Sequence, residues 1–442
     1  MSTERIHNIY RPIEERKKDF CEVELLFDRE TLLPQVERCQ SCGIPFCHGS
    51  GCPLGNLVPD QNRAVLDGDM LRAYELLSKN SDFPEFTSRI CPALCEACCV
   101  RQLDEESVMI RQTEKLIIET AYKNGWVKPR PPAKENGQRV AIIGAGPSGL
   151  SAAVTLRRKG YTVTVYEKKP DIGGLLRYGI PNFKLDKSII DRRRKIMEAE
   201  GIRFVTGVEV GKDVTADYLK KANDYLVVAI GTPAARDLKI PGRDKPGIYL
   251  ALDFLHNPNV EVKGKKVLVI GGGDTGSDCV GTSIRKGAAS VTQIEIMPEP
   301  PAERSPSTPW PMWPYMLRTS SSHKEGCTRR FNLNSLQIVG DNVVEGVEVE
   351  TVKWEFSPTG KPLKFAAVEC TRETIKCDLV LLAMGFTGVN KDNPIISQLG
   401  LAQTPRTALI SAPEKGIYCV GDCASGASLV VRALASGKSL TL

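Results

Sequence analysis

A glycine-rich turn between a predicted strand and a predicted helix constrains the fold of this chain more than any other feature. Residues 140–143 are an apolar run with β-branched side chains, which is typical of a buried parallel strand. The run leads into Gly144-Ala-Gly-Pro-Ser-Gly149, after which the apolar residues adopt helical spacing. Gly144 permits the tight turn, Gly146 lets a pyrophosphate approach the backbone, and Gly149 lets the helix pack on the strand. The phosphates would then lie at the helix N-terminus.

A carboxylate completes this pattern. A second alternating strand over residues 161–166 ends at Glu167, which is placed to bind ribose hydroxyls. A glycine motif alone is weak, but here the strand, glycines, helix, second strand and acid follow in order. We therefore predict a dinucleotide site rather than a purely structural turn.

A second copy of the pattern begins at residue 265. An apolar strand, a glycine loop, a helical stretch and a strand over residues 291–296 follow one another. The candidate nucleotide-binding residues of this copy are Gly271, Gly273, Asp274, Thr275, Gly276 and Glu295. Since strand-like segments such as 378–386 and 416–423 come later, we predict one nucleotide-binding fold inserted inside another.

Charge and hydropathy limit the other functions. The net charge of +6 is spread along the 442 residues without a long Lys/Arg block, so we expect no nucleic-acid partner. The N-terminus has no apolar core of a signal peptide, and no apolar run reaches membrane-spanning length. We expect a soluble, cytoplasmic chain without a membrane partner, in which thiols stay reduced.

The cysteines are concentrated near the N-terminus, ahead of a Pro- and charge-rich linker at residues 128–138. Nine of the 15 cysteines precede residue 100, at short gaps and with two Cys-Pro pairs. Buried structural thiols would not cluster in this way. Zinc would need paired CxxC knuckles, which only two pairs provide. Short gaps with Cys-Pro favour iron–sulfur clusters, although zinc stays open at this point.

Motifs along nearly the whole chain resemble the small (β) subunit of bacterial glutamate synthase and its kin. They are CQSCGIPFCH, SDFPEFTSRICPALCEACC, GGLLRYGIPNFKL, GGGDTGSDCVGTSIRKGA and GDCASGASLVV. The kin include the N-terminal half of dihydropyrimidine dehydrogenase and the electron-bifurcating transhydrogenases. In this family the chain usually continues beyond residue 442, so the resemblance leaves the stability of the flavin domain open.

The resemblance implies two 4Fe–4S clusters. The first would be bound by Cys39, Cys42, Cys47 and Cys99, and the second by Cys52, Cys91, Cys95 and Glu114. Cys21 and Cys98 match no ligand of the family. The residues themselves place Glu114 in an apolar helix face, where a buried ion pair is the alternative role.

The resemblance also implies FAD in the first nucleotide fold and NADPH or NADH in the inserted one. Gly174 and Arg177 would line the flavin site, and Gly421 and Asp422 would approach the ribityl chain; a helix cap is the alternative role of Asp422. The helix predicted over residues 428–440 would point its N-terminus at the flavin.

The second nucleotide site departs from the NADPH pattern of the family. A Tyr-Arg-Arg usually ends its second strand, whereas residues 295–297 are Glu-Ile-Met. A carboxylate favours a free 2′-hydroxyl over a phosphate, so we predict NADH, with Arg304 or Arg285 as cations that could restore NADPH binding. The Trp310 and Trp313 loop is either an interface element or a self-packed surface loop.

The expected class is α/β, with two Rossmann-like domains, one inserted in the other, after an α-helical iron–sulfur domain. We expect an iron–sulfur domain at 1–135, FAD-binding parts at 136–255 and 380–442, and an NAD(P)H-binding domain at 256–379. No acid–base centre is evident, so no catalytic side chain is predicted.

The resemblance implies an oxidoreductase that passes electrons from NAD(P)H through FAD and clusters to a large (alpha) subunit, which makes glutamate from glutamine and 2-oxoglutarate. An NAD(P)H–ferredoxin or transhydrogenase subunit and a non-catalytic iron–sulfur scaffold are the alternatives. A thioredoxin-reductase type is disfavoured because the second glycine loop offers only Cys279.

Overall fold

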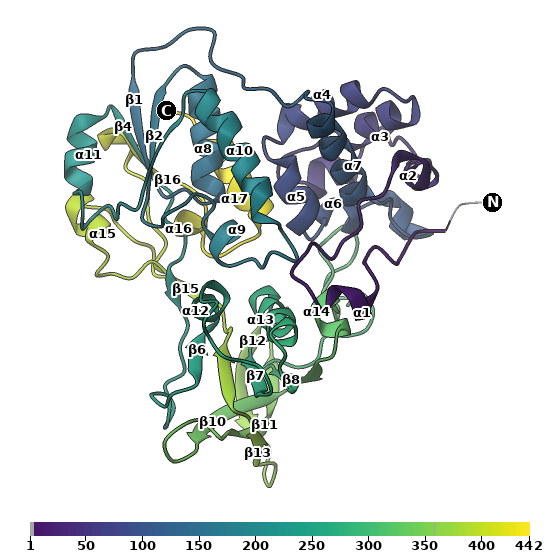
Figure 1. The fold of residues 1–442 in the computed structure, drawn as a ribbon, viewed down its shortest axis with the longest axis vertical. Coiled ribbons are helices and arrows are strands. Elements are labelled where there is room, and N and C mark those ends of the chain that lie inside the picture. The colour runs from purple at the N-terminus through teal and green to yellow at the C-terminus, as the bar shows by residue number, and fades with distance from the viewer. Residues whose placement is uncertain (1–3, 358) are drawn as a thin grey trace.

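The computed structural model describes residues 4–357 and 359–442 and divides them into three regions (Figure 1). Helices of the N-terminal region pack beside a first sheet, and a second sheet with an antiparallel extension lies below both. The mixed α/β class with two nucleotide-type sheets and a helical N-terminal region agrees with the sequence prediction.

The regular elements of the N-terminal region are short helices joined by loops. Its elements are α1 (Ile13–Arg16), α2 (Arg29–Val36), η1 (Cys47–Gly51), α3 (Val58–Leu66), α4 (Met70–Asn80), α5 (Pro84–Ile90), α6 (Leu94–Ala97), η2 (Val100–Leu103) and α7 (Ile110–Lys123). The side chains of Asp28 and Asp69 cap α2 and α4 by accepting from backbone N–H groups of their first turns. The apolar stripe of α7, including Ile117, Ile118 and Ala121, packs against Leu77.

The first sheet is parallel and has the strand order β16-β4-β1-β2-β3. Its strands are β1 (Arg139–Ile143), β2 (Thr162–Glu167), β3 (Arg203–Thr206), β4 (Tyr225–Val228) and β16 (Ile417–Cys419). The helices of this region are α8 (Pro147–Arg158), α9 (Leu175–Tyr178), α10 (Lys187–Ala199), α11 (Ala216–Ala222), α15 (Pro394–Leu399), α16 (Asp422–Ser425) and α17 (Val430–Lys438), with the 3-10 turn η3 (Pro413–Lys415). Because β16 comes almost two hundred residues after β4, the chain leaves this sheet and later returns to it.

The second parallel sheet is formed by the intervening chain, in the order β6-β14-β7-β8-β9. Its strands are β6 (Ile248–Leu250), β7 (Lys266–Ile270), β8 (Ser290–Ile294), β9 (Thr328–Arg330) and β14 (Leu379–Leu382), and its helices are α12 (Ala251–His256), α13 (Asp274–Arg285) and α14 (Ser321–Lys324). Thus β6 joins this sheet ahead of the expected boundary at residue 256, and β14 extends past the expected boundary at residue 379.

An antiparallel unit extends from the second sheet. It contains β10 (Leu333–Val339), β11 (Gly346–Phe356), β12 (Pro362–Ala367) and β13 (Glu373–Lys376). The short strands β5 (Ala234–Ala235) and β15 (Phe386–Gly388) pair with each other where the chain passes between the two sheet regions.

Buried charges hold the three regions against one another. Arg193 of α10 donates to Glu85 of α5 at 2.5 and 2.9 Å, and joins the first sheet region to the N-terminal helices. Glu325 accepts from Arg16 at 2.7 Å and from Arg285 at 2.6 Å, so it links the N-terminal region to the second sheet region. Breaking one partner of such a buried pair leaves an uncompensated charge, so these contacts fix the relative placement of the regions.

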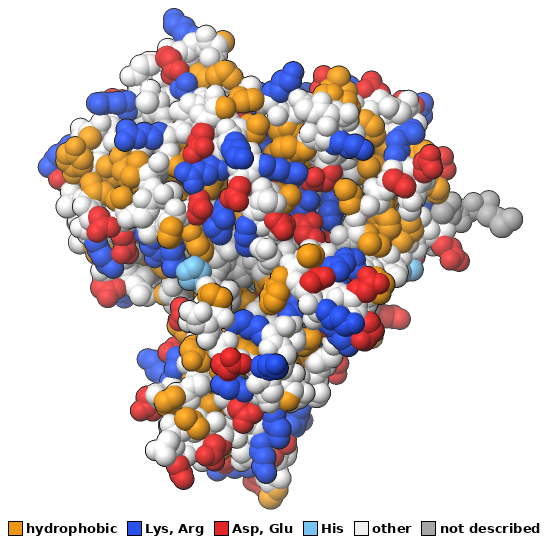
Figure 2. Space-filling model, in the orientation of Figure 1, with side chains coloured by type: hydrophobic (Ala, Val, Ile, Leu, Met, Phe, Trp, Pro, Cys, Tyr) orange, Lys and Arg blue, Asp and Glu red, His pale blue; other side chains and the backbone are white. Residues whose placement is uncertain are grey.

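Charges of both signs are interspersed over the visible surface (Figure 2). Within the described ranges, no helix is both long enough and apolar enough to cross a bilayer.

Candidate dinucleotide and iron–sulfur sites

The first glycine loop joins β1 to α8 in the conformation that a pyrophosphate requires. Gly144 has φ +105°, which a residue with a side chain rarely adopts. Gly146 is the N-cap of α8 and faces Gly174, where a Cβ would lie 2.8 Å from the Gly146 Cα. Two stretches of bare backbone therefore meet at the N-terminus of α8, and leave room for a phosphate there.

Glu167 at the end of β2 is tied to this loop. Its Oε2 accepts from the Ala145 N–H at 2.8 Å, and its Oε1 accepts from the Lys169 N–H at 2.9 Å. The carboxylate is thus held beside the glycine loop, where an adenosine ribose lies in a dinucleotide-binding βαβ unit.

The remaining residues predicted for the flavin lie near this loop but differ in their contacts. Arg177 donates through Nε to the Ile172 carbonyl at 2.8 Å and pairs with Asp191, so its guanidinium already has protein partners. Asp422 accepts from Ser428 Oγ at 2.9 Å, and burial raises the pKa of its carboxyl. The helix-cap alternative for Asp422 is wrong, because Gly421 is the N-cap and no side chain caps α16.

The second glycine loop repeats the first. Asp274, Thr275 and Gly276 form the first turn of α13, after Gly271 with φ +118° and the N-cap Gly273. Glu295 follows β8, and its Oε2 accepts from the Gly272 N–H at 2.6 Å. Its Oε1 accepts from the Met297 N–H at 3.0 Å, so its two contacts reproduce those of Glu167.

Neither arginine considered as a phosphate partner in this site is unengaged. Arg304 donates to the carbonyls of Ala97 and Met312 at 3.0 and 2.6 Å. Arg285 forms a buried pair with Glu325. Both would have to give up these contacts to bind a 2′-phosphate.

The tryptophan loop combines the two roles that the sequence left open. Trp310 packs on Phe46 with ring centroids 4.7 Å apart, and its Nε1–H donates to the Cys99 carbonyl at 3.3 Å. Trp313 instead stacks under Arg318 of the same loop, 3.5 Å from the ring centroid. The loop of the second sheet region thus covers the segment that carries Cys99.

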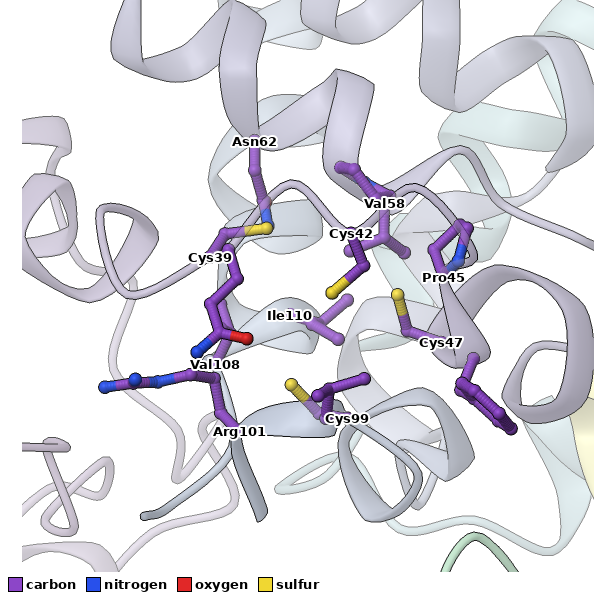
Figure 3. Close-up of a pocket in the computed structure, with 14 residues that line it drawn as sticks. Cys39, Cys42, Pro45, Cys47, Val58, Asn62, Cys99, Arg101, Val108 and Ile110 are labelled. Atoms are coloured by element: carbon purple, nitrogen blue, oxygen red, sulfur yellow. The ribbon is translucent and has the colours of Figure 1, made fainter. Parts of the chain in front are cut away.

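The four cysteines predicted for the first cluster line one pocket (Figure 3). Cys39 and Cys42 come from the loop after α2, Cys47 begins η1, and Cys99 precedes η2. The pocket has about 360 Å³ of space including its open mouth, and its other lining residues include Val58, Asn62, Val108 and Ile110. Burial raises the pKa of Cys47 to about 12. A thiol in such a setting becomes a thiolate when a metal binds it.

The residues predicted for the second cluster also lie together. Cys52, Cys91 and Glu114 are close enough for the charge of the carboxylate to raise the pKa of both thiols, after the larger effect of burial. Burial is also the main reason why the pKa of Cys95 is raised. Glu114 itself is 7% exposed, and burial raises its pKa to about 7.

Glu114 has an amide partner in place of the ion pair considered from the sequence. Asn56 Nδ2 donates to Glu114 Oε1 at 2.8 Å, and no cation pairs with the carboxylate in the described part of the chain. The carboxylate is therefore oriented but not neutralised, which suits a group that faces a cationic metal centre.

Single metal ions and clusters need differently placed ligands. Among residues 4–357 and 359–442, no three His, Cys, Asp or Glu side chains are placed to share one metal ion. The four cysteines of the first group line one pocket, as the ligands of a 4Fe–4S cluster would. Cys98 lies outside the first pocket, because its Sγ donates to the Phe46 carbonyl at 3.3 Å.

The sequence analysis missed Asn56 and Asn62. Asn56 lies shortly after Cys52, just before α3, whereas Asn62 lies within α3; both are 2% exposed. Asparagine is mostly exposed, so only its place beside a cysteine motif could have drawn attention to it.

Comparisons with known families agree with both halves of the site. Residues 138–437 match the family described as pyridine nucleotide-disulphide oxidoreductase. Residues 16–126 match the family described as dihydropyrimidine dehydrogenase domain II, 4Fe-4S cluster. The chain is therefore an NAD(P)H-dependent flavin oxidoreductase with an iron–sulfur domain.

Relatives along nearly the full length narrow this class. The chain is 44% identical over 451 residues to the glutamate synthase (NADPH) small chain of Mycobacterium tuberculosis strain CDC 1551, covering 97% of this chain and 91% of that one. It is 39% identical over 464 residues to glutamate synthase (NADH) of Saccharomyces cerevisiae, covering 99% of this chain and 22% of that one. The chain belongs to the glutamate synthase small-chain family.

The fold also resembles that of a solved oxidoreductase. Mycobacterium tuberculosis FprA in complex with NADPH has a TM-score of 0.53 at 22% identity, covering 68% of this chain and 83% of that chain.

Proposed function

We propose that this chain is the electron-input subunit of a glutamate synthase and that it delivers electrons from NAD(P)H to a large subunit. The large subunit would use them to make glutamate from glutamine and 2-oxoglutarate. The observation that carries the proposal is the presence of two dinucleotide loops and two cysteine groups on one chain with fixed contacts between the regions.

The family resemblance assigns one cofactor to each of the two nucleotide loops. Glu167 and the loop from Gly144 to Gly149 would hold FAD, and Glu295 with the loop from Gly271 to Gly276 would hold the nicotinamide nucleotide. When bound, the flavin supplies the step between a two-electron hydride donor and one-electron clusters. The chain itself needs no acid–base side chain for this chemistry, because alignment of the cofactors is what hydride transfer requires.

The packing of the cysteine groups suggests the order of electron flow. Leu54 and Ile90, which flank Cys52 and Cys91 in the sequence, pack against the core of the first sheet region. The group of Cys52, Cys91, Cys95 and Glu114 would therefore lie on the flavin side. The first group lies beyond it, in a pocket that opens to the surface.

The outer cysteine group also marks the side where the large subunit would bind. Ile44, in the loop between Cys42 and Cys47, is 82% exposed, and Leu103, shortly after Cys99, is 56% exposed. Electron transfer needs a short distance to the acceptor, so a partner that covers Ile44 and Leu103 would receive electrons from the first cluster.

The test uses the purified holoprotein alone and together with the large subunit. Alone, it should reduce ferricyanide with NAD(P)H and should form no glutamate. With the large subunit, glutamine and 2-oxoglutarate should yield glutamate. Glutamate synthesis by the isolated chain, or a purified chain that binds no flavin, would contradict the proposal; the second result would favour a non-catalytic scaffold.

A further inference from the structure

Asn62 on α3 occupies an unusual place beside the first cysteine group. Its side chain is only 2% exposed, and it lines the same pocket as Cys39, Cys42, Cys47 and Cys99. Figure 3 shows it extending from α3 toward the space that the sulfur atoms surround. Three residues of α3 line this pocket: Val58, Pro59 and Asn62. Only Asn62 has a side chain that can donate a hydrogen bond.

The amide nitrogen of Asn62 has no hydrogen-bond acceptor among the residues that the structure describes. Buried amide donors are nearly always paired, because losing water without gaining another acceptor is unfavourable. Besides Asn62, the pocket is lined by the four cysteines, by Gln40 and Arg101, and otherwise by apolar residues. An unpaired donor that faces a ring of thiols indicates an acceptor located within that ring.

We propose that the Asn62 side-chain N–H donates a hydrogen bond to a sulfur of the first 4Fe–4S cluster, and so raises its reduction potential. The proposal rests on the proposed function, in which Cys39, Cys42, Cys47 and Cys99 hold that cluster. Asn62 would not be an iron ligand. It would act on the cluster only through the hydrogen bond to the sulfur.

The direction of the effect follows from charge. Reduction adds an electron to the cluster, and its thiolate and sulfide sulfurs become more negative. A hydrogen bond to a charged acceptor is stronger than one to a neutral acceptor, so the N–H stabilises the reduced cluster more than the oxidised one. Hydrogen bonds to the sulfurs are among the features that set the potential of such clusters. With this hydrogen bond, the first cluster would accept an electron more readily than it would with its cysteine ligands alone.

The experiment measures the midpoint potential of the first cluster by electron paramagnetic resonance during a redox titration of the holoprotein. The signal of this cluster is identified as the one that Cys42→Ala removes. In Asn62→Leu, which has a similar size and no donor, the equilibrium constant for reduction should fall about tenfold, a shift of about 59 mV to lower potential for one electron. FAD and iron contents should stay at the wild-type level.

Gln61 provides a matched control. It is the neighbouring residue on α3, is 1% exposed, and also has a buried side-chain amide nitrogen without an acceptor among the described residues, but it does not line the pocket. Gln61→Leu should leave the potential of the first cluster unchanged. Equal shifts in both variants would overturn the proposal, as would an unchanged potential in Asn62→Leu.

A second measurement does not depend on the variant folding. Wild-type protein with 15N in its asparagine side-chain amides should show a nitrogen coupling in the pulsed spectrum of the reduced first cluster, and its absence would overturn the proposal. The proposed function has a separate point of failure. If Cys42→Ala leaves the iron content and every cluster signal unchanged, the cluster assignment is wrong, whatever Asn62 does.

Discussion

The carboxylate of Glu295 accepts a hydrogen bond of 2.6 Å from the backbone N–H of Gly272, the middle glycine of the second nucleotide loop. Glu167 makes the equivalent contact with Ala145 at 2.8 Å in the first loop. Each acid also accepts from the N–H two residues farther along the chain. The two nucleotide folds therefore place a carboxylate at the same point, although their sequences around it differ.

This equivalence bears on the choice of nicotinamide. A carboxylate fixed at the ribose position accepts from a free 2′-hydroxyl and repels a 2′-phosphate. We expect NADH to exceed NADPH in kcat/KM by ~10-fold, the scale of one charged contact. Glu295→Gln should narrow this ratio by improving NADPH, and Glu303→Gln, in the exposed part of the following loop, should not. Steady-state kinetics with both nucleotides measure this ratio. If NADPH is the better donor to the unmodified protein, the predicted NADH preference is wrong.

The second prediction concerns Glu114 as the fourth ligand of the second cluster. Removing it by Glu114→Ala leaves three thiolates and a donor, Asn56, without its acceptor. Iron should fall from ~8 to ~4 per chain, the difference between two clusters and one, while FAD is retained. Iron, sulfide and flavin assays on protein purified without air check this.

Cys98→Ala is the control for that experiment. Cys98 lies in the same cysteine-rich segment, but its thiol is directed at the Phe46 carbonyl and packs against Gly51. Its removal should leave the iron content unchanged. If Glu114→Ala also kept all its iron and an unaltered resonance spectrum, Glu114 would be an ordinary buried acid held by Asn56.

The conformation of the two glycine loops could be predicted from local sequence pattern. The turns at Gly144 and Gly271 require backbone conformations that favour glycine, so both loops are legible in the sequence. The cysteine gaps are similarly local. The grouping of Cys99 with Cys39, about sixty residues earlier, came only from the family resemblance, because no short-range pattern encodes it.

Contacts between distant regions could not be read in this way. The Trp310 contact with Cys99 joins residues 211 positions apart, and the Arg16 contact with Glu325 joins residues 309 positions apart. Trp310 and Arg16 are residue types that an exposed loop or a helix end also carries. Their presence in the sequence therefore does not indicate these contacts. Likewise, the sequence suggested Arg304 as a cation for the nucleotide. Its contact with the Ala97 carbonyl depends on tertiary packing and has no signal in the local sequence.

The third prediction follows from the cover that the tryptophan loop provides. Trp310→Ala removes the ring that packs on Phe46 and the donor to the Cys99 carbonyl. Loss of this cover should admit solvent and oxygen to the first pocket. Iron should therefore be lost several-fold faster in air, the rate increase that corresponds to losing a contact worth about 1–2 kcal/mol. Trp313→Ala, whose ring lies under Arg318 within the loop, should lose iron at the wild-type rate. Equal rates of iron loss in all three proteins would mean that Trp310 does not protect the cluster.

The last prediction concerns the pH dependence of stability through His323. Ser320 donates its N–H to His323 Nδ1 at 3.2 Å, and His323 Nε2 lies 2.8 Å from Gln293 Oε1. These contacts require a neutral ring with its proton on Nε2, since Nδ1 acts as an acceptor. Burial, with smaller effects from Arg329 and Lys184, lowers the pKa of His323 from 6.5 to about 4.

A lowered pKa in the folded state means that the unfolded chain binds a proton that the folded chain does not. The stability from this group is therefore complete above pH 6.5 and is lost as the pH falls toward about 4. Between about pH 7.5 and about pH 5 the free energy of unfolding should drop by about 2 kcal/mol through His323. In His323→Gln this part of the drop should vanish, whereas His7→Gln, at an exposed position, should behave like the wild type. Urea unfolding of the three holoproteins at both pH values measures it, and parallel pH profiles for His323→Gln and the wild type would show that His323 does not titrate as the contacts require.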